Sequence, residues 1–296
     1  MDDGRLVFAA KGSSESVLER LGRVRGFVFD MDGTLVLGDE RNHGLKPLPG
    51  ALEITRWLTE HGISFTVFTN GTTRTPQDYA QVLRELGFAL TDEAMMTPAS
   101  SAVDLFVQRG YKRVIVLGGD GLAMPLRKAG IEVVAPVGKP QADAVLIGWY
   151  REFTMNNLEA ACHAVWGGAK AYSASQAMFF ATAAGRTLGT SRAISAMLKD
   201  LTGCRVQVIG KPSIYALGAA GRRLGVRLKE LAIVGDDPEL EVPMAHRGRS
   251  LAIAVNTGLG KHDSFAHLAP AQWPHLTVQG VDELLSLLQS QSVQGR

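Results

Sequence analysis

The sequence predicts an α/β fold, a doubly wound parallel sheet with a second α/β block inserted into it. Two observations lead to this prediction. Short apolar runs alternate with amphipathic segments of helical period along most of the 296 residues, which is typical of parallel strands joined by crossover helices. Several of these runs also end in polar residues, as strands do at the ligand-binding edge of an open parallel sheet.

The first part of the chain contains two such units. Residues 24–29 are the first buried-strand candidate, and a helix opened by Pro49-Gly50 stops near Gly62. Residues 63–68 form the second expected strand. The next helix begins at Thr75-Pro76, because threonine is a good N-cap and proline suits the first helical position.

The middle and last parts repeat the alternation. The middle block has strands at 113–117 and 144–147 and helices at 122–128, 157–166 and about 191–201. The last part has strands at 206–209, 231–234 and 251–255, with a helix running to about residue 224. The middle block carries no acidic residues at its strand ends, unlike the rest of the chain.

Composition and charge exclude several classes of protein. Hydrophobic residues make up 46% and charged residues 20% of the chain, and the net charge is +2, so we expect a globular protein and no nucleic-acid partner. No apolar run of about 18 residues is present and no secretory signal is visible. Two cysteines, Cys162 and Cys204, suggest neither a disulfide framework nor a metal site. A cytoplasmic location without membrane association is the expectation.

Reactive side chains follow four of the expected strands, and they suit a phosphate monoester. If those strands are neighbours, the side chains converge on one site. The residues are Asp30 and Asp32, Thr69 and Asn70, Lys211, and Asp236. Three carboxylates would repel a phosphate dianion. A divalent cation together with the Lys211 ammonium would offset that repulsion. Carboxylates with no neighbouring His or Cys favour Mg²⁺.

The two aspartates of the first segment divide the proposed chemistry. Asp30 and Asp32 are two residues apart, so on an extended segment their side chains project to one side. We hypothesise that Asp30 is the nucleophile that forms an aspartyl-phosphate, and that Asp32 is the general acid and base. Thr69 and Asn70 are expected to donate hydrogen bonds to phosphate oxygens, and Gly71 allows the backbone to approach closely.

These segments resemble the four ordered motifs of the haloacid dehalogenase-like phosphatases. They are Asp30-Met31-Asp32-Gly33-Thr34, Thr69-Asn70-Gly71, Lys211-Pro212 and Gly235-Asp236-Asp237-Pro238. The resemblance implies a Rossmann-like core in which Asp30 is the nucleophile. It also implies that Asp32 provides both the acid/base group and a backbone carbonyl for Mg²⁺, that Asp236 ligates the metal, and that Thr69, Asn70 and Lys211 bind the phosphoryl group.

The spacing of the motifs locates an inserted cap domain. Only 14 residues separate Thr34 from Pro49, whereas 139 separate Gly71 from Lys211. We therefore predict a core at 1–102 and 204–296 and an α/β cap at 103–203. This arrangement is similar to the NagD-like subclass IIA, which includes p-nitrophenyl, phosphoglycolate and pyridoxal phosphatases. The resemblance implies a small phosphorylated metabolite as substrate and a homodimer formed through the cap.

Two positions depart from the family pattern. A second aspartate usually follows the first by five residues in the fourth motif, and Glu241 stands there. We expect metal binding to survive, with Glu241 as a nearby anion and Asp237 as a spare carboxylate. In the cap, Ser175-Gln176-Ala177 replaces a polar, acidic turn. This replacement favours a leaving group with less charge or with apolar surface.

Two alternatives to a phosphatase remain open. The same phosphoenzyme can transfer its phosphoryl group to an acceptor other than water, which would make the chain a phosphotransferase. A catalytically weak protein can also use the same residues to bind a phosphometabolite, although binding alone does not need an acid/base carboxylate beside a nucleophile. A dehalogenase is disfavoured, because Asp32 and the metal would be superfluous.

Overall fold

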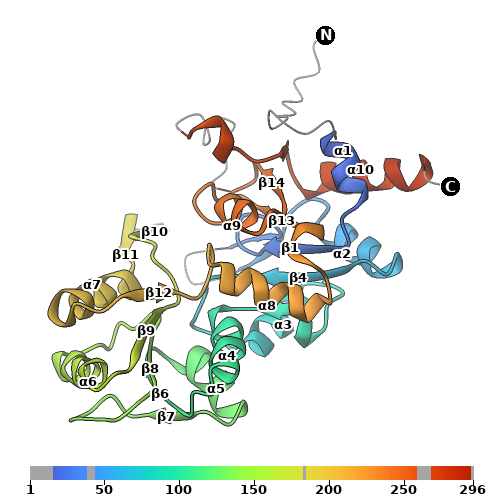
Figure 1. Cartoon of the computed structure of the whole chain (residues 1–296). Coiled ribbons are helices and arrows are strands. Elements are labelled where there is room, and N and C mark those ends of the chain that lie inside the picture. Colours follow the sequence, from blue (N-terminus) through green and yellow to red (C-terminus); the bar gives the residue numbers. More distant parts are fainter. Residues whose placement is uncertain (1–15, 39–43, 183–184, 259–267, 295–296) are drawn as a thin grey trace. The chain divides into compact units, whose positions relative to one another are not determined.

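The computed structural model describes residues 16–38, 44–182, 185–258 and 268–294. Their contacts divide the chain into two compact units. Unit 1 comprises residues up to Thr69, Ala80–Met95 and Ala220 onward, and unit 2 comprises Asn70–Tyr79 and Met96–Ala219. Unit 2 comes mostly from one continuous middle stretch of the chain, coloured from green to yellow in Figure 1, together with a short segment that ends in the first turn of α3.

Unit 1 is built on a six-stranded sheet of order β15-β14-β13-β1-β4-β5. Pairing is parallel between β1 and its neighbours β4 and β13, and from β13 through β14 to β15. The strands are β1 (Gly26–Asp30), β4 (Ser64–Phe68), β5 (Met95–Met96), β13 (Leu231–Gly235), β14 (Leu251–Val255) and β15 (Leu276–Val278). All five residues of β1, β13 and β14 are buried, as expected for central strands covered on both faces.

Helices and short elements complete unit 1. The helices are α1 (Val17–Gly22), α2 (Ala51–Glu60), α9 (Glu241–Gly248) and α10 (Val281–Gln294), and β2 (Val36–Leu37) pairs with β3 (Lys46–Pro47) in a small antiparallel ladder. Three 3₁₀ turns lie at Asp92–Ala94, Leu228–Glu230 and Pro270–Gln272. Helix α9 packs on β13 and β14, and α2 packs on β4 and α10.

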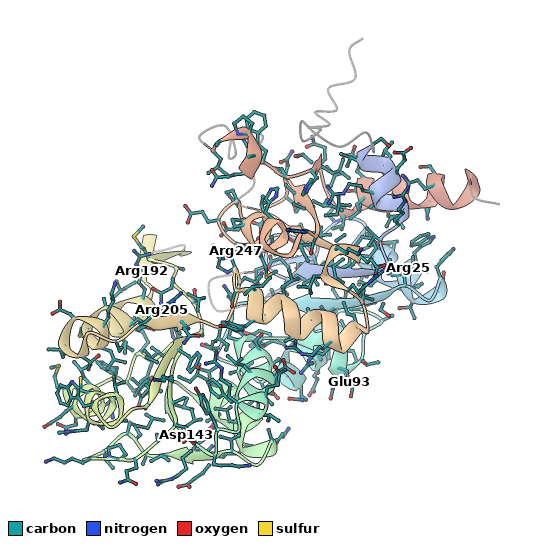
Figure 2. The ribbon with its side chains drawn as sticks, in the orientation of Figure 1. Arg25, Glu93, Asp143, Arg192, Arg205 and Arg247 are labelled. Carbon is teal, nitrogen blue, oxygen red and sulfur yellow. The ribbon has the colours of Figure 1, made fainter. Side chains whose placement is uncertain are left out.

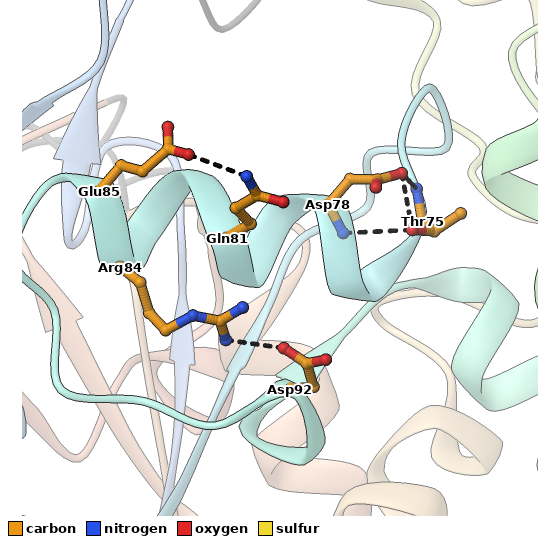
Figure 3. Close-up of polar contacts among 6 residues, drawn as sticks. All are labelled: Thr75, Asp78, Gln81, Arg84, Glu85 and Asp92. Atoms are coloured by element: carbon orange, nitrogen blue, oxygen red, sulfur yellow. Dashed lines mark hydrogen bonds and ion pairs between the residues drawn. The ribbon is translucent and has the colours of Figure 1, made fainter.

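Helix α3 (Pro76–Glu85) begins with the predicted cap (Figure 3). The backbone N–H of Asp78 donates to Thr75 Oγ1 at 3.2 Å, and the Asp78 carboxylate accepts from the Thr75 backbone and hydroxyl. This reciprocal arrangement satisfies N–H groups that have no partner inside the helix. At the other end of the helix, Arg84 bonds Asp92 at 2.7 Å.

Unit 2 contains a five-stranded, fully parallel sheet of order β12-β9-β8-β6-β7. The strands are β6 (Arg113–Leu117), β7 (Glu132–Val134), β8 (Ala144–Ile147), β9 (Lys170–Ser173) and β12 (Val206–Val208). The helices are α4 (Pro98–Gln108), α5 (Asp120–Lys128), α6 (Met155–Trp166), α7 (Thr190–Thr202) and the first part of α8 (Ile214–Leu224). An antiparallel hairpin joins β10 (Phe179–Thr182) to β11 (Gly185–Leu188).

Alternate residues of this sheet enter two separate cores. Val114, Val116 and Leu146 pack with the buried faces of α4 and α5. Their neighbours Ile115 and Val145 instead pack with those of α6 and α7. Because successive side chains of a strand point to opposite faces, the sheet is covered by helices on both sides. The predicted α/β fold with parallel sheets and flanking helices is therefore confirmed.

The assignment of strand 206–209 to the sheet that carries Asp30 is wrong. The strand, β12, pairs with β9 in unit 2, with Val206 opposite Ala171. Of the four strands expected to be neighbours, three lie together, in the order β13-β1-β4. An apolar run indicates a strand but does not say which sheet it joins, since the partner is fixed by distant packing. The predicted boundaries at 102/103 and 203/204 stay a prediction, and residues 103–203 all lie within unit 2.

No helix among the described residues is long and apolar enough to cross a membrane.

Candidate active site

Asp30 is the last residue of β1, the strand that lies between β13 and β4. It is 8% exposed and stands opposite Phe68, the last residue of β4. On the other side, Val234 of β13 is opposite Phe29. The carboxyl ends of three neighbouring strands therefore meet around Asp30, where an open parallel sheet binds its ligands.

A tight turn follows β1 and places Asp32. The backbone N–H groups of Leu35 and Val36 both donate to Met31 O at 3.0 Å, and the Gly33 N–H donates to Val36 O at 2.8 Å. Gly33 has φ +83°, a left-handed conformation that favours glycine. The turn fixes Asp32 just beyond the strand, half-buried and paired with Val36 in an isolated bridge.

Thr69 connects β4 to this turn. Its side chain is 3% exposed, and its Oγ1 donates a hydrogen bond to Asp32 Oδ2 at 3.2 Å. Two of the predicted site residues, 37 positions apart in the chain, are thus in direct contact. The bond orients one carboxylate oxygen of Asp32.

Asp236 follows β13 and packs against the same turn. It is 4% exposed, and a Cβ atom placed on Gly33 would lie 2.5 Å from its Oδ2. Thr257, after β14, donates from Oγ1 to Gly33 O at 2.5 Å and fixes the turn from the other side. Sequence reasoning gave Thr257 no role, although it lies two residues after the predicted strand 251–255.

Glu241 is the first residue of α9 and is 1% exposed. Its Oε2 accepts the backbone N–H of Asp237 at 3.2 Å, and a Cβ on Gly235 would lie 2.5 Å from its Cδ. The longer side chain therefore reaches back across the loop that carries Asp236. Glu241 holds this loop through the Asp237 backbone, and its expected role as a nearby anion stays a prediction.

Unit 2 brings together Asn70 and Lys211, which are 141 residues apart in the sequence. The Asn70 Nδ2 donates to Lys211 O at 3.0 Å, and the Lys211 backbone N–H donates to Asn70 Oδ1 at 2.8 Å. Lys211 is 2% exposed and precedes a cis peptide bond to Pro212. A Cβ on Gly210 would lie 2.5 Å from Asn70 Oδ1, so glycine is required for this close approach. The Asn70 amide thus positions Lys211, a role that its motif did not suggest.

Gly71 and Thr72 continue this segment. Gly71 is half-buried. Thr72, which is 5% exposed, accepts the backbone N–H of Trp149 on Oγ1 at 3.0 Å. Sequence reasoning did not single out Thr72. Its contact ties the residues after Asn70 to the end of β8 within unit 2.

The side chains present fit a magnesium ion of the expected kind. Among the described residues, no three His, Cys, Asp or Glu side chains are grouped as ligands of one metal. The expected set does not require such a group, because it consists of the Asp30 and Asp236 carboxylates and the Asp32 backbone carbonyl. Mg²⁺ is commonly held by one or two carboxylates and several waters. Asp30 and Asp236 follow adjacent strands and are both nearly buried.

Comparison with known proteins decides the family. A sequence model described as haloacid dehalogenase-like hydrolase matches residues 27–132, and a second of the same group matches 208–284. The chain belongs to the haloacid dehalogenase-like hydrolases. Both matches contain predicted motifs, the first around Asp30 and Thr69 and the second around Lys211 and Asp236.

Named relatives agree with the NagD-like subclass of this family. Mouse chronophin is 29% identical over 283 residues, covering 91% of this chain and 94% of its own. The 5′-nucleotidase YutF of Bacillus subtilis is 26% identical, covering 81% and 90%. The crystal structure of a 4-nitrophenylphosphatase from Thermotoga maritima is 25% identical, covers 92% and 99%, and superposes with a TM-score of 0.79. The predicted subclass and the prediction of a phosphatase are confirmed.

Proposed function

We propose that this phosphatase hydrolyses phosphate monoesters of small metabolites with Mg²⁺, through an aspartyl-phosphate on Asp30. The observation that carries the proposal is the group of polar side chains at the ends of β4, β1 and β13. Thr69, Asp30 and Asp236 are nearly buried there, and Asp32 is bonded to Thr69. A nucleophile, a proton donor and metal ligands are the groups that this reaction needs.

The first step transfers the phosphoryl group to the enzyme. A carboxylate oxygen of Asp30 attacks phosphorus, and the bond from phosphorus to the ester oxygen breaks. The Asp32 carboxylic acid gives its proton to that oxygen, which leaves as an alcohol. When bound by Asp30, Asp236 and the Asp32 carbonyl, Mg²⁺ offsets the negative charge that the phosphate brings to the carboxylates.

The second step returns the enzyme to its starting state. Asp32, now a carboxylate, takes a proton from a water molecule whose oxygen attacks phosphorus. The bond from phosphorus to the Asp30 oxygen breaks, and inorganic phosphate leaves. We assign Thr69, Asn70, Gly71 and Lys211 to the phosphoryl oxygens. Lys211 supplies the positive charge, and Asn70, which directly follows Thr69 in the chain, holds the Lys211 backbone.

We further propose that the leaving group has apolar surface or little charge. The Ser175-Gln176-Ala177 turn uses its polar groups internally. Ser175 Oγ accepts the Ala177 N–H at 3.2 Å, and Gln176 Nε2 donates to Ser195 Oγ at 3.4 Å. Met178, the next residue, is 56% exposed. A strong preference for phosphoglycolate over substrates with apolar leaving groups would end this proposal.

A substrate panel tests the function. Phosphate release is measured from p-nitrophenyl phosphate, nucleoside 5′-monophosphates and sugar phosphates, with Mg²⁺ or with a chelator. We expect Mg²⁺-dependent release and substrate kcat/KM values that differ by orders of magnitude. Release that persists undiminished with the chelator would contradict the metal assignment. Micromolar binding without turnover would favour the alternative of a phosphometabolite-binding protein.

Product analysis separates hydrolysis from transfer. With an added alcohol, a phosphatase yields inorganic phosphate, whereas a phosphotransferase yields a new phosphate ester. We expect inorganic phosphate to account for the substrate consumed. The homodimer through the predicted cap and the cytoplasmic location stay predictions, and sedimentation of the purified protein checks the first.

A further inference from the structure

Unit 2 contains a cavity that none of the proposed catalytic residues lines. Its volume is about 450 Å³, within the range of small-molecule sites. The walls come from α7, from the loop of residues 203–205 that follows it, from the first residue of β12 and from Gln176. All of these segments lie inside unit 2, so the cavity does not depend on unit 1.

The charged residues that line this cavity are all basic. Of the nine residues that line it, three are basic, namely Arg192, Lys199 and Arg205, and none is acidic. Arg192 and Lys199 are seven residues apart on α7 and therefore lie on one face of the helix, two turns apart. Figure 2 labels Arg192 and Arg205 close together in this part of unit 2. The chain as a whole has a net charge of only +2, so this is a local concentration.

Nearby carboxylates do not neutralise these cations. Within the part of the chain that the structure describes, none of the three forms an ion pair with an acidic side chain. Asp200 follows Lys199 directly, but adjacent residues of a helix do not face the same way, and Asp200 does not line the cavity. Three like charges around one cavity repel one another, and an anion bound between them relieves that repulsion.

Donors in the cavity wall are already oriented. One guanidinium nitrogen of Arg192 donates to Gln176 O at 3.1 Å, which fixes the arginine while most of its five N–H groups remain available. Ser195, 4% exposed, gives its one hydroxyl proton to Ser191 O at 2.6 Å, so the cationic side chains are the donors that an anion would meet. A fixed guanidinium with further cations suits the bidentate recognition of phosphate oxygens.

We propose that this cavity binds a small polyvalent anion of the phosphate class, with Arg192, Lys199 and Arg205 as its cationic ligands. The proposal goes beyond the proposed function, because its cationic ligands take no part in the proposed catalysis, although Gln176 of the cavity wall also belongs to the Ser175-Gln176-Ala177 turn. The same chemistry has two sources, a free phosphate-containing ligand or a distal anionic group of the substrate, and the second source would contradict the weakly charged leaving group proposed above. Kinetics with two kinds of substrate distinguishes these sources.

Cys204 provides a reporter inside the cavity. It is half-buried and lines the wall, whereas the only other cysteine, Cys162, is 3% exposed. The full chain is labelled with N-ethylmaleimide, a neutral reagent, and the rate at Cys204 is followed by mass spectrometry with increasing pyrophosphate. We expect a saturable decrease of roughly tenfold, because a bound anion covers the thiol and limits the access on which its reactivity depends. Potassium chloride of equal ionic strength serves as the reference.

Two variants test whether the protection of Cys204 by pyrophosphate depends on the cations of the cavity. Lys199→Gln with Arg205→Gln removes two exposed charges, and we expect it to abolish the protection while circular dichroism stays unchanged. Lys128→Gln at the end of α5, outside the cavity, removes one exposed charge and keeps the protection. A labelling rate that pyrophosphate does not change, that chloride lowers equally, or that pyrophosphate still lowers in the double variant would overturn the proposal.

Kinetics then identifies the source of the anion. If the substrate supplies it, the double variant raises KM for monoesters with a second anionic group and leaves KM for p-nitrophenyl phosphate unchanged. If a free ligand supplies it, KM is unchanged for both kinds of substrate, and only pyrophosphate protection of Cys204 is lost.

Discussion

The molecule contains two parallel sheets of similar construction, and they differ in the residues at the carboxyl ends of their strands. In unit 1, β1 ends in Asp30, β4 is followed by Thr69, and β13 is followed by Asp236. In unit 2, the central strands β6 and β8 are followed by Gly118 and Gly148. A Cβ on either glycine would meet the Leu122 side chain, so these strand ends serve close packing. Both sheets contain parallel strands, and we expect the strand-end side chains to decide which one carries chemistry.

The largest effect is expected at the strand end of unit 1. Asp30→Asn removes the nucleophile, and we expect kcat to fall roughly a thousandfold or more. Asp120, at the start of α5 after β6, is the counterpart in unit 2, and its side chain is exposed apart from a 3.5 Å contact with Arg127. Asp120→Asn should leave kcat/KM within about twofold. Both variants are assayed with p-nitrophenyl phosphate. If Asp120→Asn lowered activity as much as Asp30→Asn does, catalysis would not depend specifically on the strand ends of unit 1.

The second effect depends on the leaving group. Asp32→Asn removes the proton donor, and we expect kcat for an alkyl phosphate to fall roughly a hundredfold or more. Because p-nitrophenolate leaves without protonation, kcat/KM, which reports only the first step, should fall much less for p-nitrophenyl phosphate than for the alkyl phosphate. The Thr69 hydrogen bond to position 32 can persist, since the asparagine carbonyl also accepts. Equal losses of kcat/KM for both substrates would contradict the role of Asp32 as proton donor to the leaving group.

Gly33 tests the packing at the active end of unit 1. In Gly33→Ala, a φ of +83° strains the backbone, and the new Cβ would stand 2.5 Å from Asp236 Oδ2. Gly44 is the matched control, with φ +63° and no heavy atom within 4 Å of the place that a Cβ would take. Backbone strain alone costs about 1–2 kcal/mol. We expect urea unfolding to show a larger loss for Gly33→Ala than for Gly44→Ala, together with a raised Mg²⁺ requirement. Equal losses and an unchanged Mg²⁺ requirement would mean that the contact with Asp236 is not needed.

A pH effect on stability should belong to unit 1. Burial, followed by the charges of Arg20 and His246, lowers the pKa of His275 to about 4. Its Nδ1 accepts the Ala252 N–H at 2.9 Å, which requires an unprotonated nitrogen. The unfolded chain therefore takes up a proton near pH 6.5, before the folded protein does, so stability is complete above that pH and declines as the pH falls toward 4.

Unfolding at pH 7.5 and pH 5 measures this decline. We expect the free energy of unfolding to be lower at pH 5 by about 1–2 kcal/mol, after allowance for partial solvent screening. In His275→Gln, the free energy of unfolding should no longer differ between pH 7.5 and pH 5 for this reason. His163→Gln, in unit 2, should keep the difference. A decline that survives in His275→Gln would assign the acid sensitivity to other groups.

The sequence predicted which reactive side chains stand at strand ends, but it did not predict how the segments that carry them pack together. An aspartate directly after a buried strand is visible in the sequence, because strand period and burial are local properties. The bond from Asn70 to Lys211 depends on packing between segments that are 141 residues apart, and the sheet that β12 joins is likewise set by distant partners. Thr257 and Thr72 each act through one hydrogen bond, and an isolated threonine after a strand carries no distinctive pattern.

The smallest effect is expected at Glu241, where this chain departs from its family. In Glu241→Gln, the side-chain carbonyl still accepts the Asp237 N–H, so the loop before α9 keeps its shape while one negative charge is lost. We expect kcat to change little and the Mg²⁺ concentration for half-maximal activity to rise by roughly tenfold or less. Glu239→Gln, an exposed neighbour on the same loop, makes the same charge change without a buried contact. If the two variants shift the Mg²⁺ requirement equally, Glu241 acts only through long-range charge. If Glu241→Gln alone shifts it, the buried carboxylate stabilises the metal site through the loop that carries Asp236.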